Sequence, residues 1–273
     1  MKIERKRKFR ELTPRIGCVK YLNARPLIHG WAGEVVLDHP AALCNKLARG
    51  ELDVALVSSF ELLRNPIYRI VDDVSISSDG PVYSVVVAHR DELGKLEQIG
   101  IDPASETSVN LLRCLLGQCG LNPLLSWHRR PAGDSAGEKH WPDADATAQL
   151  LIGDQGIRFR RDHPEFRFWD LGEEWKRIVD FPFVYALWLI RPEFGAAKTI
   201  ADRLRALRDE NLAKIDNLIA DEKEFDPVFC RRYYTEHLRF TFGDEEKEGL
   251  QQFQRLCAKH GLLAHRKLNL ELV

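Results

Sequence analysis

An amide and two cations stand together where an apolar segment near the N-terminus ends. The segment closes at Val19, and Lys20, Asn23 and Arg25 follow it closely. Amide and cationic side chains at a strand end supply hydrogen-bond donors and positive charge, which is the chemistry that holds an anionic ligand. Because 40 basic residues balance 41 acidic ones, any anionic ligand must be held by local groups such as these.

Hydroxyl side chains form a second polar group further along the chain. Ser105 and Thr107 lie between a predicted strand and a predicted helix that ends at Gly120. Hydroxyls and free backbone N–H groups at a helix N-terminus can bind an anion. The alternative interpretation is that Ser105 or Thr107 simply caps the helix.

Alternating strand and helix patterns must position these groups. The stretches RIGCV, HPAALCNKLARGEL and DVALVSS predict a βαβ unit, whose parallel strands bind ligands at their carboxyl ends. In AQLLIGDQGIRF, Asp154 follows another predicted strand and faces the same presumed cleft. Ser58 to Glu61 has the spacing of a capping box, which predicts a helix cap there.

The order of these elements predicts an α/β fold with two lobes. The apolar run FPFVYALWLIRP is too long for one ordinary strand, which indicates a segment passing from one lobe to the other. We therefore expect a first, discontinuous lobe made of residues 1–89 and 184–273, and an inserted second lobe made of residues 90–183.

Composition excludes several classes of protein. A net charge of −1 lacks the basic footprint of a nucleic-acid binder. No window approaches eighteen consecutive apolar residues, and the basic start is followed by no apolar signal run, so a cytoplasmic protein without a membrane span is expected. The six cysteines include no CxxC pair, which favours reduced thiols over a zinc site or a disulfide framework.

Seven stretches, in order from about residue 15 to about 265, resemble the chorismate dehydratase family of the futalosine route to menaquinone. They are YLNARPL, GELDVALVSSFELLR, YRIVDDVSISSDGPVYSV, SETSVNLLRCLL, LLIGDQGIRF, DLGEEWKRIVDFPFVYALW and EGLQQFQRLCAKHGLL. The resemblance implies the fold of type II periplasmic binding proteins, with a ligand cleft between two lobes. It also implies a cytoplasmic enzyme that removes water from chorismate to give 3-(1-carboxyvinyloxy)benzoate.

This reaction makes modest demands on the protein. Chorismate is a dianion, and loss of a ring proton together with the neighbouring hydroxyl makes its ring aromatic, which supplies the driving force. The protein must clamp two carboxylates and fix the substrate's conformation, while proton transfer needs a weak acid or base at most. No metal or redox cofactor is required, and the chain contains no HExxH, GxGxxG or Walker motif.

The resemblance also implies roles for particular residues. Asn23 and Ser84 correspond to polar cleft residues of the family. Asn23 would hold the departing hydroxyl or a carboxylate, and Ser84 would bond the enolpyruvyl group or relay a proton. Thr107 and Ser108 would clamp a carboxylate. The alternatives are that Asn23 satisfies its own turn and that Ser84 bonds backbone within a strand.

The proton acceptor stays open at this point. In this family the enolpyruvyl carboxylate of the substrate is thought able to take the proton, so no protein base is required. Asp154 is a candidate base, and its alternative is a structural role at the strand end.

The chain departs from the family pattern at several positions. Lys20 stands where a small hydroxyl residue is common, and with Arg25 it would strengthen dianion binding, fill the substrate's space or face away. Glu106 replaces a basic residue and would repel an anion unless it points outward or pairs with Lys20 or Arg25. Val179 and Asp180 replace a Thr and a Gly.

Two other functions stay open. One is a related enzyme that cleaves a cyclic futalosine derivative, which would need a catalytic histidine in the cleft. None of the nine histidines falls in a matching motif. The other is a non-catalytic intracellular binding protein for a small carboxylate.

Overall fold

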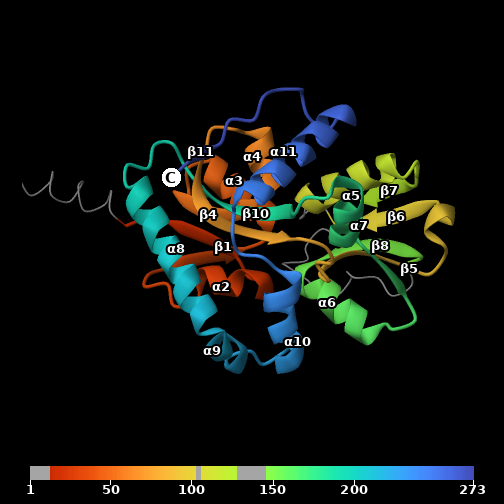
Figure 1. Ribbon diagram of the computed structural model, residues 1–273, viewed down its shortest axis with the longest axis horizontal. Coiled ribbons are helices and arrows are strands. Elements are labelled where there is room, and N and C mark those ends of the chain that lie inside the picture. The colour runs from red at the N-terminus through yellow and green to blue at the C-terminus, as the bar shows by residue number, and fades with distance from the viewer. Residues whose placement is uncertain (1–12, 103–105, 128–145) are drawn as a thin grey trace, which may run out of the picture.

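Two β-sheets lie side by side, with helices packed around them (Figure 1). The computed structural model describes residues 13–102, 106–127 and 146–273. The first sheet has the order β11-β4-β10-β3-β1-β2 and the second has the order β7-β6-β8-β5-β9. The α/β architecture with two lobes, expected from the sequence, is therefore confirmed.

The first sheet takes strands from both ends of the described chain. They are β1 (Ile16–Val19), β2 (Val35–Asp38), β3 (Val54–Ser58), β4 (Arg69–Ser78), β10 (Phe183–Ile190) and β11 (Glu271–Leu272). Its helical segments are η1 (Leu22–Ala24), α2 (Arg25–Ile28), α3 (Pro40–Ala48), α4 (Ser59–Arg64), α8 (Ala197–Ala213), α9 (Ile215–Ala220), α10 (Pro227–Arg232), the π-helical turn η3 (Tyr233–His237) and α11 (Asp244–Lys259). Strands β1 and β3 pair in parallel with α3 between them, which confirms the predicted βαβ unit.

The second sheet is built from the middle of the chain. Its strands are β5 (Val85–His89), β6 (Gln98–Ile101), β7 (Leu124–Trp127), β8 (Ala148–Ile152) and β9 (Arg167–Asp170). The accompanying helices are η2 (Leu93–Lys95), α5 (Glu106–Gln118), α6 (Gly153–Asp162) and α7 (Leu171–Val179). The predicted helix ending near Gly120 corresponds to α5.

The chain passes between the sheets twice, through a first crossing segment at 79–84 and a second at 180–182. Strand β10 lies wholly in the first sheet, between β3 and β4. The apolar run from Phe181 to Pro192 therefore passes between lobes only at its first two residues, which belong to the second crossing segment, while its strand stays in the first sheet. Strand β5 pairs with β8 and β9. We propose these two segments as the lobe boundaries, in place of the expected limits at 89/90 and 183/184.

Each crossing segment contains a non-glycine residue in the left-handed backbone region. Tyr83 has φ of 67° and Asp180 has φ of 62°. Asp180 is the C-cap of α7, where glycine is the usual choice and aspartate is tolerated.

A core of large aromatic side chains packs next to the second crossing. Trp175 of α7, Phe183 of β10 and Phe253 of α11 have ring centroids 4.9–6.0 Å apart.

Replacing Gly249 by alanine tests how tightly α11 packs on the second crossing segment. A Cβ at Gly249 would lie 2.0 Å from the carbonyl oxygen of Pro182, so the helix or the crossing must shift. We expect Gly249→Ala to lower the free energy of unfolding by about 1–3 kcal/mol, despite the higher helix propensity of alanine. Gly195→Ala is the control, because a Cβ there has no neighbour within 4 Å. Equal stability of the two variants in denaturant titrations would contradict this packing.

Candidate functional site

A pocket lies between the two sheets and takes residues from both. Its empty space is about 600 Å³, a figure that includes solvent at its open mouth. Seventeen residues line it: Val19, Tyr21, Asn23, Pro40, Val57, Ser58, Ile76, Val82, Ser84, Val85, Thr107, Ser108, Ile152, Gly153, Tyr185, Ala186 and Leu238. None of these side chains is charged. We call this cavity the enclosed pocket because it lies between the two sheets, although its mouth is open to solvent.

Three helices point their N-termini at the enclosed pocket. Helix α3 begins at Pro40, α6 begins at Gly153, and Thr107 and Ser108 lie in the first turn of α5. A helix N-terminus carries unpaired backbone N–H groups and the positive end of the helix dipole. The pocket therefore favours negative charge although none of its described lining residues is cationic.

Asn23 and Ser84 are the two residues expected to be catalytic. Both line the enclosed pocket. Asn23 lies in η1, and its buried Oδ1 has no hydrogen-bond partner among the described residues. Ser84 is fully buried at the end of the first crossing segment, and its Oγ accepts a hydrogen bond from Tyr233 Oη at 2.7 Å. An unpaired amide oxygen and an oriented hydroxyl therefore face one cavity.

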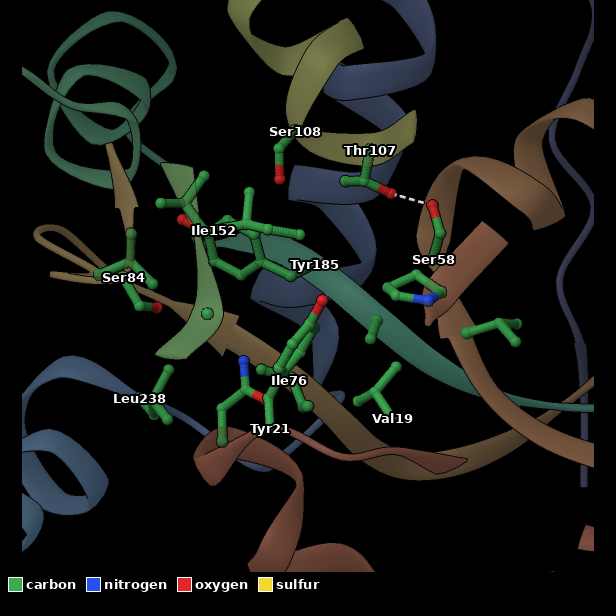
Figure 2. A pocket seen from close by; sticks show the side chains of 17 residues that line it. Val19, Tyr21, Ser58, Ile76, Ser84, Thr107, Ser108, Ile152, Tyr185 and Leu238 are labelled. Carbon is green, nitrogen blue, oxygen red and sulfur yellow. Dashed lines mark hydrogen bonds between the residues drawn. The ribbon is translucent and has the colours of Figure 1, made fainter. Parts of the chain in front are cut away.

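Thr107 connects the two lobes across the pocket. Its Oγ1 forms a hydrogen bond with the Ser58 hydroxyl (Figure 2). The same oxygen accepts a hydrogen bond from the Phe60 N–H at 3.2 Å. Ser58 occupies the N-cap position of α4, yet its side chain makes no capping hydrogen bond. The capping-box prediction is therefore wrong, because Ser58 faces the cleft. Ser108 is buried and lines the same pocket. Ser105 lies outside the described residues.

Lys20, Arg25 and Asp154 line a neighbouring cavity instead, which we call the outer pocket. Its lining residues are Lys20, Tyr21, Leu22, Arg25, His39, Asp154, Gln155, Arg158, Glu222, Glu224 and Phe225. Tyr21 lines both pockets and Asn23 lines the enclosed pocket, whereas Lys20 lines the outer pocket alone. Arg25 forms an ion pair with Glu222. The two cations after β1 therefore do not reach the enclosed pocket.

Asp154 joins the lobes at the rim of the outer pocket. Its Oδ1 accepts a hydrogen bond from the Leu22 N–H at 2.9 Å, which connects α6 to η1. Burial raises the pKa of Asp154 to about 6, an effect that the Leu22 N–H and Arg158 partly oppose. This geometry gives Asp154 a structural contact with the residue that precedes Asn23.

The other departures from the family pattern also place their charges outside the enclosed pocket. Glu106 pairs with Arg64 at 2.7 Å, and not with Lys20 or Arg25. Asp180 has a side chain that is 89% exposed and pairs with Lys176 at 3.1 Å. Val179 is not among the pocket residues either. An anionic ligand in the enclosed pocket would therefore contact none of these three residues directly.

Sequence reasoning missed Ser58, Tyr185 and Tyr233. Tyr185 is buried at the pocket, with its hydroxyl 3.1 Å from the hydroxyl of Ser78. Tyr233 lies 149 positions from its partner Ser84, so no local spacing could have revealed the contact. The adjacent tyrosines Tyr233 and Tyr234, with His237 three residues later, are the one feature of the sequence that could have drawn attention to this segment.

Neither a metal cluster nor a membrane span is found along the described ranges. No group of three or more His, Cys, Asp or Glu side chains there is arranged to hold a metal ion. No helix there combines the length and the apolar character needed to cross a bilayer.

Fold and pocket together define a two-lobed protein of the periplasmic-binding-protein type. The alkanesulfonate-binding protein SsuA from Xanthomonas axonopodis pv. citri, solved bound to MOPS, is similar with a TM-score of 0.65 and 15% identity, covering 93% of this chain and 95% of that chain. A structural-genomics protein from Archaeoglobus fulgidus is similar with a TM-score of 0.69 and 17% identity, covering 92% of this chain and 98% of that chain. At such identities the likeness shows the fold alone.

The chain belongs to the menaquinone biosynthesis family, whose sequence model matches residues 14–259. A curated relative, the chorismate dehydratase of Thermus thermophilus, is 29% identical over 260 residues. The alignment covers 87% of this chain and 93% of that relative. The family resemblance noted in the sequence is therefore confirmed.

The raised pKa of Asp154 predicts a specific dependence of stability on pH. Because the folded state binds this proton more readily than the unfolded state, the contribution of Asp154 is full below about pH 4 and is lost as the pH rises through about 6. Asp154→Asn keeps an acceptor for the Leu22 N–H without a charge to bury. We expect the variant to exceed the wild type in stability at pH 8, by about 2–3 kcal/mol, and to match it at pH 4. Thermal melts of both proteins from pH 4 to pH 8 measure the difference. A wild type that is more stable than Asp154→Asn at pH 8 would contradict the assignment.

Proposed function

We propose that this protein is a chorismate dehydratase, a hydro-lyase that converts chorismate into 3-(1-carboxyvinyloxy)benzoate. The observation that carries the proposal is the enclosed pocket, in which Asn23 and Ser84 face one cavity ringed by helix N-termini. Family membership and the name of the Thermus relative support it. We further propose that the reaction belongs to the futalosine route and takes place in the cytoplasm, as the sequence resemblance implies.

Fixed dipoles would hold the two carboxylates of the substrate. Backbone N–H groups and hydroxyls at the start of α5, near Thr107 and Ser108, form one clamp, and the start of α6 at Gly153 forms the other. Preorganised donors of this kind cost no reorganisation when the reaction occurs. They also fix the conformation of the substrate, and positioning of this sort is worth about 7–11 kcal/mol of barrier in favourable cases.

Asn23 and Ser84 would act at the reacting atoms. The enolpyruvyl carboxylate takes the ring proton, and the electrons of the C–H bond form a ring double bond as the neighbouring C–O bond breaks. The departing hydroxide takes up the proton held by the carboxylate and leaves as water. Asn23 holds the departing hydroxyl by donating a hydrogen bond from Nδ2 to its oxygen, which favours its loss. Ser84 donates to the enolpyruvyl group.

The substrate's own carboxylate is the proton acceptor in this proposal. Among the described residues, no carboxylate side chain lines the enclosed pocket, and Asp154 lies at the outer pocket bonded to Leu22. We therefore assign Asp154 no part in proton transfer. Lys20 and Arg25 also line the outer pocket. In this proposal neither side chain contacts the bound substrate.

The alternatives gain less from the structure. In the part of the chain that the structure describes, no histidine lines the enclosed pocket, whereas the related futalosine-pathway enzyme would need one there. A non-catalytic binding protein for a small carboxylate would use the same uncharged pocket. It would bind chorismate without consuming it, so a turnover assay separates the two functions.

Turnover of chorismate tests the proposed function directly. Purified protein mixed with chorismate, without metal or nucleotide, is expected to form a product lighter by one water, followed by ultraviolet absorbance and mass spectrometry. Asn23→Ala and Ser84→Ala are each expected to lower kcat by about 100-fold or more, because each removes a group at the reacting atoms. Folding of the variants is checked by circular dichroism. Binding without product by the folded wild type would favour the binding-protein alternative.

Substrate affinity tests the clamp of neutral donors. Ser108→Ala is expected to raise KM by about tenfold, because a hydrogen bond to a charged group contributes about 1.5–3 kcal/mol. Lys20→Ala is expected to change KM by less than about threefold, because this exposed cation lies outside the enclosed pocket. Steady-state kinetics at physiological salt measure both, and the reverse order of effects would show that the cations bind the substrate.

A further inference from the structure

Tyr233, from the C-terminal part of the chain, contacts Ser84 at the enclosed pocket. Helix α10 runs directly into the π-helical turn η3, in which Tyr233 is the first residue. Its ring is fully buried and stacks on Phe229, with centroids 5.5 Å apart and planes 15° from parallel. Short π-helical turns are frequent at functional sites, which is the first indication that this segment serves the pocket.

Neighbouring contacts fix the position of this turn. Tyr234 Oη donates a hydrogen bond to the carbonyl oxygen of Leu22 at 3.1 Å, and Leu22 precedes Asn23 in η1. The turn is thus anchored next to Asn23 while Tyr233 reaches Ser84. One short segment therefore contacts the surroundings of both residues proposed to react with the substrate.

The hydrogen bond from Tyr233 determines what Ser84 can do. Tyr233 Oη donates to Ser84 Oγ at 2.7 Å, so the single hydrogen of Ser84 cannot point back toward Tyr233. Ser84 lines the enclosed pocket, which leaves the ligand as the natural acceptor of that hydrogen. Chains of hydroxyl groups also polarise one another, which makes the second donor stronger.

Tyr233 keeps its proton in this environment. Burial raises the pKa of Tyr233 far above that of an ordinary tyrosine, although interactions with Ser84 and Asn23 lower it. The hydroxyl is therefore a donor throughout the physiological pH range.

We propose that Tyr233 is a positioning residue that holds Ser84 as a hydrogen-bond donor to the ligand. The proposal rests on the proposed dehydratase function, because Ser84 is assigned to the substrate's enolpyruvyl group. Tyr233 itself touches no reacting atom. Its hydrogen bond to Ser84 Oγ prevents the Ser84 hydrogen from pointing toward Tyr233, so that this hydrogen points toward the ligand.

A double-mutant cycle separates this role from a merely structural one. Tyr233→Phe removes one oxygen and is expected to lower kcat about tenfold while KM changes less than about twofold. In the Ser84→Ala background the same substitution is expected to cause no further loss of kcat. Tyr68→Phe is the matched control, because it removes a buried tyrosine hydroxyl bonded to Glu61 away from the pocket. Additive losses in the double variant, or an equal loss in the control, would overturn the proposal.

A structural measurement keeps the proposal testable if chorismate is not turned over. In a crystal structure of Tyr233→Phe, Ser84 Oγ is expected to leave the rotamer that it occupies in the wild type, because its partner is gone. An unchanged Ser84 rotamer would show that Tyr233 does not orient it. Failure of wild-type turnover with a displaced Ser84 would instead reject the dehydratase function and retain the positioning role.

Discussion

A single buried carboxylate holds the first crossing segment in place. Asp170 accepts hydrogen bonds from the backbone N–H groups of Val82 and Tyr83 at 3.0 and 2.7 Å, and from those of Gly172 and Glu173 at 3.0 and 3.1 Å. It thereby ties the start of α7 to the residues before Ser84. Four backbone hydrogen bonds to one carboxyl group can maintain the left-handed backbone of Tyr83. The direction of the Ser84 side chain, and with it the geometry of the pocket, depends on this contact.

Charge is kept at the perimeter of the site and out of its interior. Arg25 pairs with Glu222, Arg64 pairs with Glu106 and Arg158 pairs with Glu224, all outside the enclosed pocket. In the proposed site, N–H dipoles and hydroxyls would balance a bound dianion, and their effect grows as water is excluded. The same surroundings place none of the described side-chain carboxylates beside the substrate. This arrangement is consistent with an elimination in which the substrate supplies its own base.

Local patterns predicted the elements better than they predicted the site. The βαβ unit at 16–58 and the hydroxyl cluster at the start of α5 followed from periodicity and from helix-terminus chemistry. The roles of Lys20 and Arg25 stayed open in the sequence, because residue type shows that a cation follows β1 but not which cavity it faces. Ser58 matched a local capping pattern, yet its partner Thr107 lies 49 positions away. Long-range contacts of this kind, like that of Tyr233 with Ser84, become visible only when the fold brings the segments together.

The most direct test of the account is a crystal structure with 3-(1-carboxyvinyloxy)benzoate bound. The account predicts both carboxylates inside the enclosed pocket, contacted by N–H groups and hydroxyls at the starts of α5 and α6, with Ser84 donating to the enolpyruvyl group. It also predicts no contact between the ligand and Lys20 or Arg25. A carboxylate paired with either cation in the outer pocket would contradict the central claim that uncharged donors of the enclosed pocket bind this dianion.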